Sequence, residues 1–158
     1  MVPARLGLED ADGDWFSGLA QHYGLEKAVA ERFRLHRQTR RGLHLAARDH
    51  CPPAQPKPQG SGLFFYRTNS RPPKLTTSGA LLLGGEIRQN QLELTEAQRR
   101  LYLSRQAFHP EAMQVRDCAP GQVLVRYRGV ALGVAVLYRS GELQSLFPKR
   151  WSGCASSD

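Results

Sequence analysis

The amino-acid sequence predicts an α+β protein with a small sheet or barrel in its C-terminal half. The first observation is the stretch 121–151, where Val123 and Val125 alternate with other residues before an almost wholly apolar, β-branched run at 130–137. The second is a helical spacing of apolar residues at 15–23. Because the run at 130–137 has too little alternation for a solvated face, we expect it in the core.

Two glycine-bearing breaks divide the stretch 121–151. Arg128-Gly129 and Ser140-Gly141 leave three pieces, each short enough for one strand. The sequence therefore predicts a meander of three consecutive antiparallel strands.

Composition favours a polyanionic partner. The chain has 158 residues, enough for one domain or two small ones, with a formal charge of +8 and a pI near 9.9. Arginine far outnumbers lysine, which suits bidentate phosphate contacts and stacking on bases. A GC-rich genome is an alternative cause of the arginine bias.

The first fifty residues predict a small α+β unit. Residues 1–13 are expected to be loose, and a helix is expected at 15–23 between an Asp14 cap and Gly24. A second helix is expected at 25–33.

After these helices, the spacing of apolar residues changes from helical to an alternation of apolar and polar residues. Residues 33–37 and 42–46 predict a hairpin around the basic turn 38–41, with one continuous helix over 26–50 as the alternative that Gly42 opposes. Six arginines within seventeen residues make this segment a candidate phosphate-binding patch, or a solvated basic face without a ligand. They are Arg32, Arg34, Arg37, Arg40, Arg41 and Arg48.

A linker is predicted at 51–62, which contains four prolines, two glycines and no bulky apolar residue. It divides the chain into a unit at 1–50 and a larger one at 63–151. A flexible tail is expected at 152–158.

The larger unit is expected to begin with a strand at 63–66 and a loop at 69–74 in which Arg71 and Lys74 flank two prolines. Further strands are predicted at 80–83 and over 86–94, where a turn is expected near Gln89-Asn90.

A helix is expected to follow the N-cap Thr95 and to end before Pro110. Its arginines either contact a ligand or are solvated, and the solvated interpretation is favoured: Arg99, Arg100 and Arg105.

No catalytic, metal or cofactor motif is found in the sequence. The five histidines form no H-E-x-x-H pattern, and Gly84-Gly85 is not followed by the residues of a phosphate loop. The three cysteines are far apart, and Asp117 disfavours a Cys118 thiolate. We therefore expect a cytoplasmic protein that is not an enzyme, with no cofactor, no metal and no membrane segment.

The segments Gly121-Gln-Val-Leu-Val-Arg-Tyr-Arg-Gly129, Ala131-Leu-Gly133, Gly141-Glu-Leu143 and Phe147-Pro-Lys149 resemble the C-terminal PUA-like domain of RsmF-type ribosomal RNA 5-methylcytosine methyltransferases. The similarity extends in outline to the small domain that precedes it in that family. The resemblance implies a PUA-like mixed β pseudobarrel with short helices, preceded by a small α+β unit. It also implies binding of ribosomal or transfer RNA.

The sequence departs from the family in three respects, one of which is that the family's Arg-Phe-Glu-Pro-Ser-His stretch appears here as Gln91-Leu-Glu-Leu-Thr-Glu96. It has no methyltransferase domain, so we expect no methylation by this chain alone. Val136 and Gln144 stand where basic family residues are common. This loss supports an alternative function, a protein-interaction module that docks a separate RNA methyltransferase or ribosome assembly factor.

The expected function is therefore a non-catalytic RNA-binding module of rRNA or tRNA modification and ribosome maturation. Nine basic residues are the candidate RNA contacts: Arg37, Arg40, Arg41, Arg71, Lys74, Arg126, Arg128, Lys149 and Arg150. Tyr66, Tyr127 and Trp151 are candidates for stacking on an unpaired base, although core packing is the favoured role of each.

Overall fold

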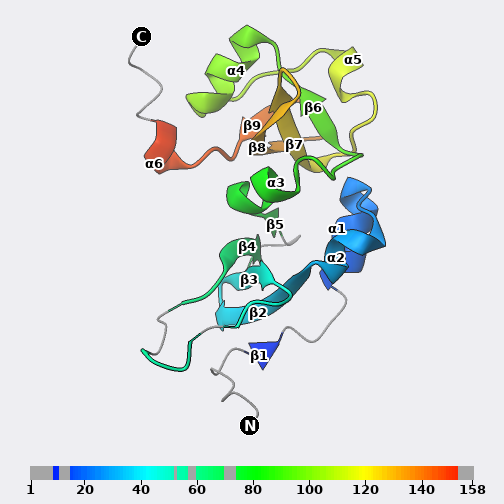
Figure 1. The fold of residues 1–158 in the computed structure, drawn as a ribbon. Helices are drawn as coiled ribbons and strands as arrows, with labels where there is room; N and C mark the ends of the chain where they lie inside the picture. Colours follow the sequence, from blue (N-terminus) through cyan, green and yellow to red (C-terminus); the bar gives the residue numbers. More distant parts are fainter. Residues whose placement is uncertain (1–8, 11–14, 52, 57–59, 70–73, 153–158) are drawn as a thin grey trace.

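Two sheets and six short helices form the structure, a computed structural model that describes residues 9–10, 15–51, 53–56, 60–69 and 74–152. The strand orders are β1-β2-β3-β4-β5 and β6-β7-β8-β9. The predicted α+β class is confirmed. Both sheets are open in the described part of the chain, where no closed barrel forms. Figure 1 shows the first sheet at one end of the molecule, the second at the other, and α3 between them.

The first sheet is antiparallel throughout. Its strands are β1 (Glu9–Asp10), β2 (Phe33–Thr39), β3 (Gly42–Ala47), β4 (Leu63–Arg67) and β5 (Lys74–Leu75). The predicted hairpin is confirmed, and the alternative helix over 26–50 is wrong. The expected loose segment 1–13 contributes β1, and the rest of it lies outside the described residues.

Two helices precede the hairpin. The predicted helix is confirmed as α1 (Trp15–Tyr23), whereas α2 (Lys27–Glu31) is shorter than the predicted 25–33. The helix α2 ends early because the chain turns directly into β2, and Arg32 N bonds back to Val29 O at 3.3 Å.

The second sheet contains the predicted meander, and the three strands are confirmed. They are β7 (Gly121–Tyr127), β8 (Val130–Leu137) and β9 (Leu143–Ser145). Arg128 and Gly129 link β7 to β8 with φ angles of 50° and 76°, as a tight hairpin turn requires. A short strand, β6 (Gln91–Glu93), pairs with β7 in parallel. The sequence did not predict this pairing.

The strand predicted at 80–83 is wrong, because these residues lie in α3 (Thr77–Leu83). The Thr76 side chain caps this helix by accepting a hydrogen bond from Gly79 N at 3.0 Å. At Gly79 a side chain would meet Phe65 O at 2.8 Å, so glycine allows α3 to lie close to β4.

Of the strands predicted over 86–94, the part after the expected turn is confirmed as β6, whereas residues 86–88 form no strand. Before β6, the amides of Arg88 and Gln89 bond to Tyr23 O at 2.9 and 3.1 Å, so this segment is attached to α1 rather than to a strand.

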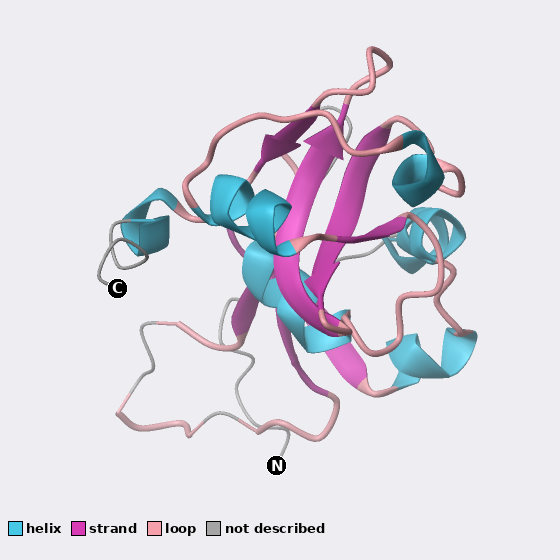
Figure 2. Ribbon diagram, turned by 90° about the horizontal axis from the view of Figure 1, so that it is seen from above, coloured by secondary structure: helices cyan, strands magenta, loops and turns pink. Residues whose placement is uncertain are grey.

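The helix expected after Thr95 is confirmed as α4 (Glu96–Leu103) with a complete capping box. It ends well before Pro110, and Arg105 has a left-handed φ of 62°. Two further short helices, α5 (Ala112–Val115) and α6 (Lys149–Ser152), were not predicted. In Figure 2 the strands lie in the middle with helices around them, and the helix nearest the C-terminus is at the edge of the molecule.

The strands β7 and β8 separate two hydrophobic clusters. Leu124 and Val134 belong to the first cluster, with the apolar residues of α1, β2, β3 and β4. Val123 and Val125, on the other face of β7, belong to the second cluster with Tyr102 of α4. This burial on both faces explains the weak alternation of the sequence in these strands.

A buried polar residue, Gln122, connects the segments around the first cluster. Its side chain accepts hydrogen bonds from Tyr23 Oη and Leu75 N, both at 2.9 Å, and donates to Leu75 O at 2.8 Å. Gln122 therefore joins α1 and β5 to β7.

The segment 51–62, predicted as a boundary between two units, connects β3 to β4, which pair in the same sheet. That the two parts are separate units stays a prediction. Of the predicted tail, Ser152 lies in α6 and 153–158 lie outside the described residues. Among the helices of the described chain, none is long and apolar enough to cross a membrane.

Candidate nucleic-acid interface

One end of the first sheet collects basic side chains from three strands and a turn. Arg40 and Arg41 lie in the β2–β3 turn, and Arg67 on β4 pairs with Gly42, the first residue of β3. Lys74 on β5 pairs with Arg67 in turn. We call Arg37, Arg40, Arg41, Arg67 and Lys74 the hairpin surface.

The hairpin surface is mostly exposed, since only Lys74 is half-buried. The Arg67 guanidinium lies 5.2 Å from the centre of the Phe64 ring, which holds its aliphatic stem against β4. Arg37, Arg40, Arg67 and Lys74 form no ion pair in the described part of the chain. Three of these four cations are exposed, and Lys74 is half-buried.

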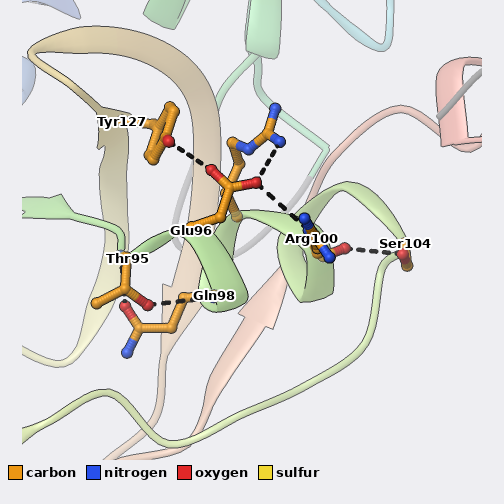
Figure 3. Close-up of polar contacts among 7 residues, drawn as sticks. Thr95, Glu96, Gln98, Arg100, Ser104 and Tyr127 are labelled. Atoms are coloured by element: carbon orange, nitrogen blue, oxygen red, sulfur yellow. Dashed lines mark hydrogen bonds and ion pairs between the residues drawn. The ribbon is translucent and has the colours of Figure 1, made fainter. Parts of the chain in front are cut away.

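A second basic group surrounds the start of α4. The Thr95 capping box places Glu96 in the first helical turn, where a carboxylate is favoured. Glu96 Oε1 accepts from Arg99 at 2.7 Å and from Arg100 at 3.3 Å, and Oε2 accepts from the Tyr127 hydroxyl (Figure 3). We call Glu96, Arg99, Arg100, Tyr127 and Arg128 the α4 cluster.

Tyr127 organises this cluster from the end of β7. The Arg99 and Arg128 guanidinium carbons lie 5.0 and 5.1 Å from the centre of its ring, within the range of cation–π attraction. The hydrogen bond from Tyr127, followed by that from Arg99, lowers the pKa of Glu96 to about 2. The same bond to Glu96 raises the pKa of Tyr127. At neutral pH the cluster therefore contains one carboxylate and three guanidinium groups.

The candidate contact Arg126 is engaged by the protein itself. Its side chain donates to Gln91 Oε1 at 2.7 Å, to Gly129 O at 3.0 Å and to Gly84 O. Because it is half-buried and donates from all three nitrogens, it supports the β7–β8 turn and offers little to a ligand.

The other candidate contacts fall in three places. Lys149 and Arg150 are exposed on α6, and Arg128 is exposed in the α4 cluster. Arg71 lies outside the described residues. The structure thus distributes the candidates over the hairpin surface, the α4 cluster and α6 instead of one continuous site.

The three candidate stacking residues differ in exposure. Tyr66 is half-buried against the first cluster, and burial raises its pKa. Tyr127 is half-buried between arginines, whereas the Trp151 side chain is 47% exposed. Of these three residues, Trp151 is the most exposed.

The described histidines and cysteines form no metal cluster or activated thiol. No three metal-ligating side chains come together in the ranges that the structure describes. His36 and His44 stack with ring centres 6.1 Å apart on the first sheet. Burial, with a smaller effect of Asp117, raises the pKa of the Cys118 thiol, which disfavours the nucleophilic thiolate.

The sequence interpretation missed three basic residues that take part in these surfaces. Arg67 could have been found from its position one residue after the predicted strand, at the same end of the sheet as the basic turn. Arg99 and Arg100 were interpreted as solvated, and no local signal reveals that Tyr127, about thirty residues later, contacts the same carboxylate.

No protein-family profile matches this sequence, and a search of curated proteins finds no match.

Proposed function

We propose that this protein is a non-catalytic RNA-binding module of ribosomal or transfer RNA maturation. The hairpin surface is the observation that carries the proposal. Basic residues from β2, β4, β5 and the β2–β3 turn gather at one end of a sheet, and four of them have no acidic partner in the described chain. Such a surface neutralises phosphates without base-specific contacts.

Two further features support an RNA ligand. The α4 cluster adds guanidinium groups held in a fixed position by Tyr127 and Glu96. The resemblance of 121–149 to the PUA-like domain of RsmF-type methyltransferases also favours RNA over DNA. A cytoplasmic location belongs to the same proposal.

The test is a binding titration with total tRNA, an rRNA fragment and duplex DNA of equal length, between about 50 and 200 mM salt. We expect one RNA to bind well above the DNA at the higher salt. If all three bind equally and are lost together with salt, the net charge alone explains binding and the proposal fails.

A variant in which Arg37, Arg40 and Arg41 are all replaced by alanine tests whether RNA binds at the hairpin surface. Each lost phosphate contact on a single strand reduces the salt slope by about 0.7, so we expect a reduction of about 2 and weaker binding. The matched control replaces the exposed Arg88, Arg116 and Arg139, which removes the same charge elsewhere. Equal effects of the two variants would show that the hairpin surface has no special role.

A second candidate function is the docking of an RNA methyltransferase or assembly factor. It is favoured by two leucines of α3, Leu81 and Leu82, whose side chains are 44% and 46% exposed. Replacing both with serine should abolish binding of such a partner and leave the RNA titration unchanged.

A further inference from the structure

A chain of three aromatic rings leads from the second core to the surface. Tyr102 is fully buried, and its hydroxyl donates to Val134 O at 3.0 Å. Phe147 packs edge-on against Tyr102 with ring centres 5.7 Å apart, and Trp151 packs edge-on against Phe147 at 5.9 Å. The outermost ring, Trp151, is 47% exposed.

The position of Trp151 is fixed by contacts of the residues beneath it. Phe147 N donates to Ser145 Oγ at 3.1 Å, and that hydroxyl donates to Tyr102 O at 2.7 Å. Arg105, in its left-handed conformation, donates to Phe147 O. Trp151 N itself bonds to Pro148 O at 2.9 Å. The exposed indole is therefore held on the core.

Three basic residues lie near this ring, two on α6 and one in the segment that follows α4. Lys149 and Arg150 precede Trp151 on α6 and are exposed, as is Arg105. None of the three forms an ion pair with a described residue. A large exposed aromatic ring beside unpaired cations matches a ligand that has both a flat apolar face and a phosphate.

We propose that Trp151, held on Phe147 and flanked by Lys149 and Arg150, is a stacking platform for an unpaired base of single-stranded RNA. The inference rests on the proposed RNA-binding function and specifies the kind of RNA. A base within a duplex has both faces covered by its neighbours, whereas an unpaired base can leave the stack and lie on the indole. The cations then contact the phosphates on either side of that base.

The test uses the fluorescence of Trp151 in a Trp15→Phe protein, since the chain has two tryptophans. We titrate it with a single-stranded oligouridine and with an RNA duplex of equal length at about 100 mM salt. Oligouridine should quench the fluorescence and the duplex should not. In the Trp151→Ala protein, which keeps Trp15, the quenching should be absent.

Affinity is the second measurement. Stacking of one base on an aromatic side chain corresponds to about 1–3 kcal/mol, so Trp151→Ala should weaken oligouridine binding by roughly 5- to 150-fold. Trp151→Phe should restore most of the loss. The matched control is Tyr138→Ala, which removes another exposed aromatic ring of 44% exposure and should leave the affinity unchanged.

The outcomes separate the two proposals. If RNA binds but Trp151→Ala has the same affinity as the unsubstituted protein, the platform is wrong and the RNA-binding function stands. Equal quenching by the duplex overturns the selectivity for single strands. If no RNA binds even at about 50 mM salt, both proposals fail together.

Discussion

The two sheets differ in the side chains that lie on their two faces. In the first sheet, Leu35, Leu43 and Leu45 face the first cluster, whereas the opposite face carries stacked rings, His36, His44 and Phe64. In the second sheet, β7 is buried on both faces by the two apolar clusters.

On the polar face of the first sheet, Ser61 in the connection between β3 and β4 contacts His36. His36 is 6% exposed, and its Nε2 donates to Ser61 O at 2.9 Å. Ser61 Oγ lies 3.0 Å from Nε2 of His50, at the start of the same connection. The comparison shows that one sheet is stabilised by apolar packing on both sides, and the other partly by groups that can titrate.

The largest expected effect comes from Gln122→Leu, which tests whether the two sheets unfold together. The substitution leaves the Tyr23 hydroxyl and both backbone polar groups of Leu75 buried without their partner. Each unsatisfied buried group costs about 1–3 kcal/mol, so the free energy of unfolding should fall by about 3 kcal/mol or more. Urea denaturation followed by circular dichroism measures it.

The matched control is Gln106→Leu at an exposed position, which should change the free energy of unfolding by less than about 0.5 kcal/mol. Hydrogen exchange then shows whether both sheets lose protection in the Gln122 variant. If β2–β4 loses protection while β7–β8 keeps it, the two sheets are separate cooperative units, as the linker at 51–62 predicts.

Lowering the pH should reduce stability by a smaller amount, and this loss should be confined to the first sheet. Burial, followed by the neighbouring His36, lowers the pKa of His44 below its ordinary 6.5. Below pH 6.5 the unfolded chain therefore binds more protons at this residue than the folded one, so stability falls as the pH decreases. Amide exchange at pH 7.5 and 5.5 should show lost protection in β2–β4 and little change in β7–β8.

The variant His44→Phe should flatten this pH dependence. Nδ1 of His44 is buried without a hydrogen-bond partner, so phenylalanine loses no bond there and can pack against Phe64, whose ring centre is 5.2 Å away. The control His109→Phe, at an exposed histidine, should retain the pH dependence. If amide protection in the His44 variant keeps the same pH dependence, His44 is not its cause.

Local sequence signals predicted the elements that depend on local chemistry. The meander followed from Arg128-Gly129 and its apolar strands, and α4 from the Thr95 cap. The segment 80–83 was mistaken for a strand because a short apolar run fits either structure, and packing of α3 between the sheets decides it. The parallel pairing of β6 with β7 also depends on tertiary contacts.

The candidate interface was predictable only where its residues are close in sequence. Arg37, Arg40 and Arg41 form a visible cluster, whereas Arg67 and Lys74 join it through strand register. From the sequence alone, Arg126 and Arg128 are equal candidates, although in the structure Arg126 donates to backbone and side-chain acceptors and Arg128 is exposed. A count of arginines does not distinguish a structural one from an available one.

The smallest expected effect concerns Tyr127→Phe in the α4 cluster, on the surface of the second sheet. The tyrosine hydroxyl is the largest cause of the low pKa of Glu96, so this pKa should rise from about 2 toward its ordinary 4.5. A lowered carboxyl pKa stabilises the folded state above 4.5, and the stabilisation is lost as the pH falls toward about 2.

The unsubstituted protein should therefore be more stable than the Tyr127 variant above about pH 4.5, and this difference should shrink as the pH falls toward about 2, because the variant has less of the stabilisation to lose. Carboxyl ¹³C chemical shifts report the pKa of Glu96 directly. Tyr138→Phe, which removes an exposed hydroxyl bonded to Gln144, is the control and should leave the Glu96 titration in place. An unchanged Glu96 pKa in the Tyr127 variant would mean that Arg99 and Arg100 hold the carboxylate by themselves. The second sheet would then owe none of its acid sensitivity to this hydrogen bond.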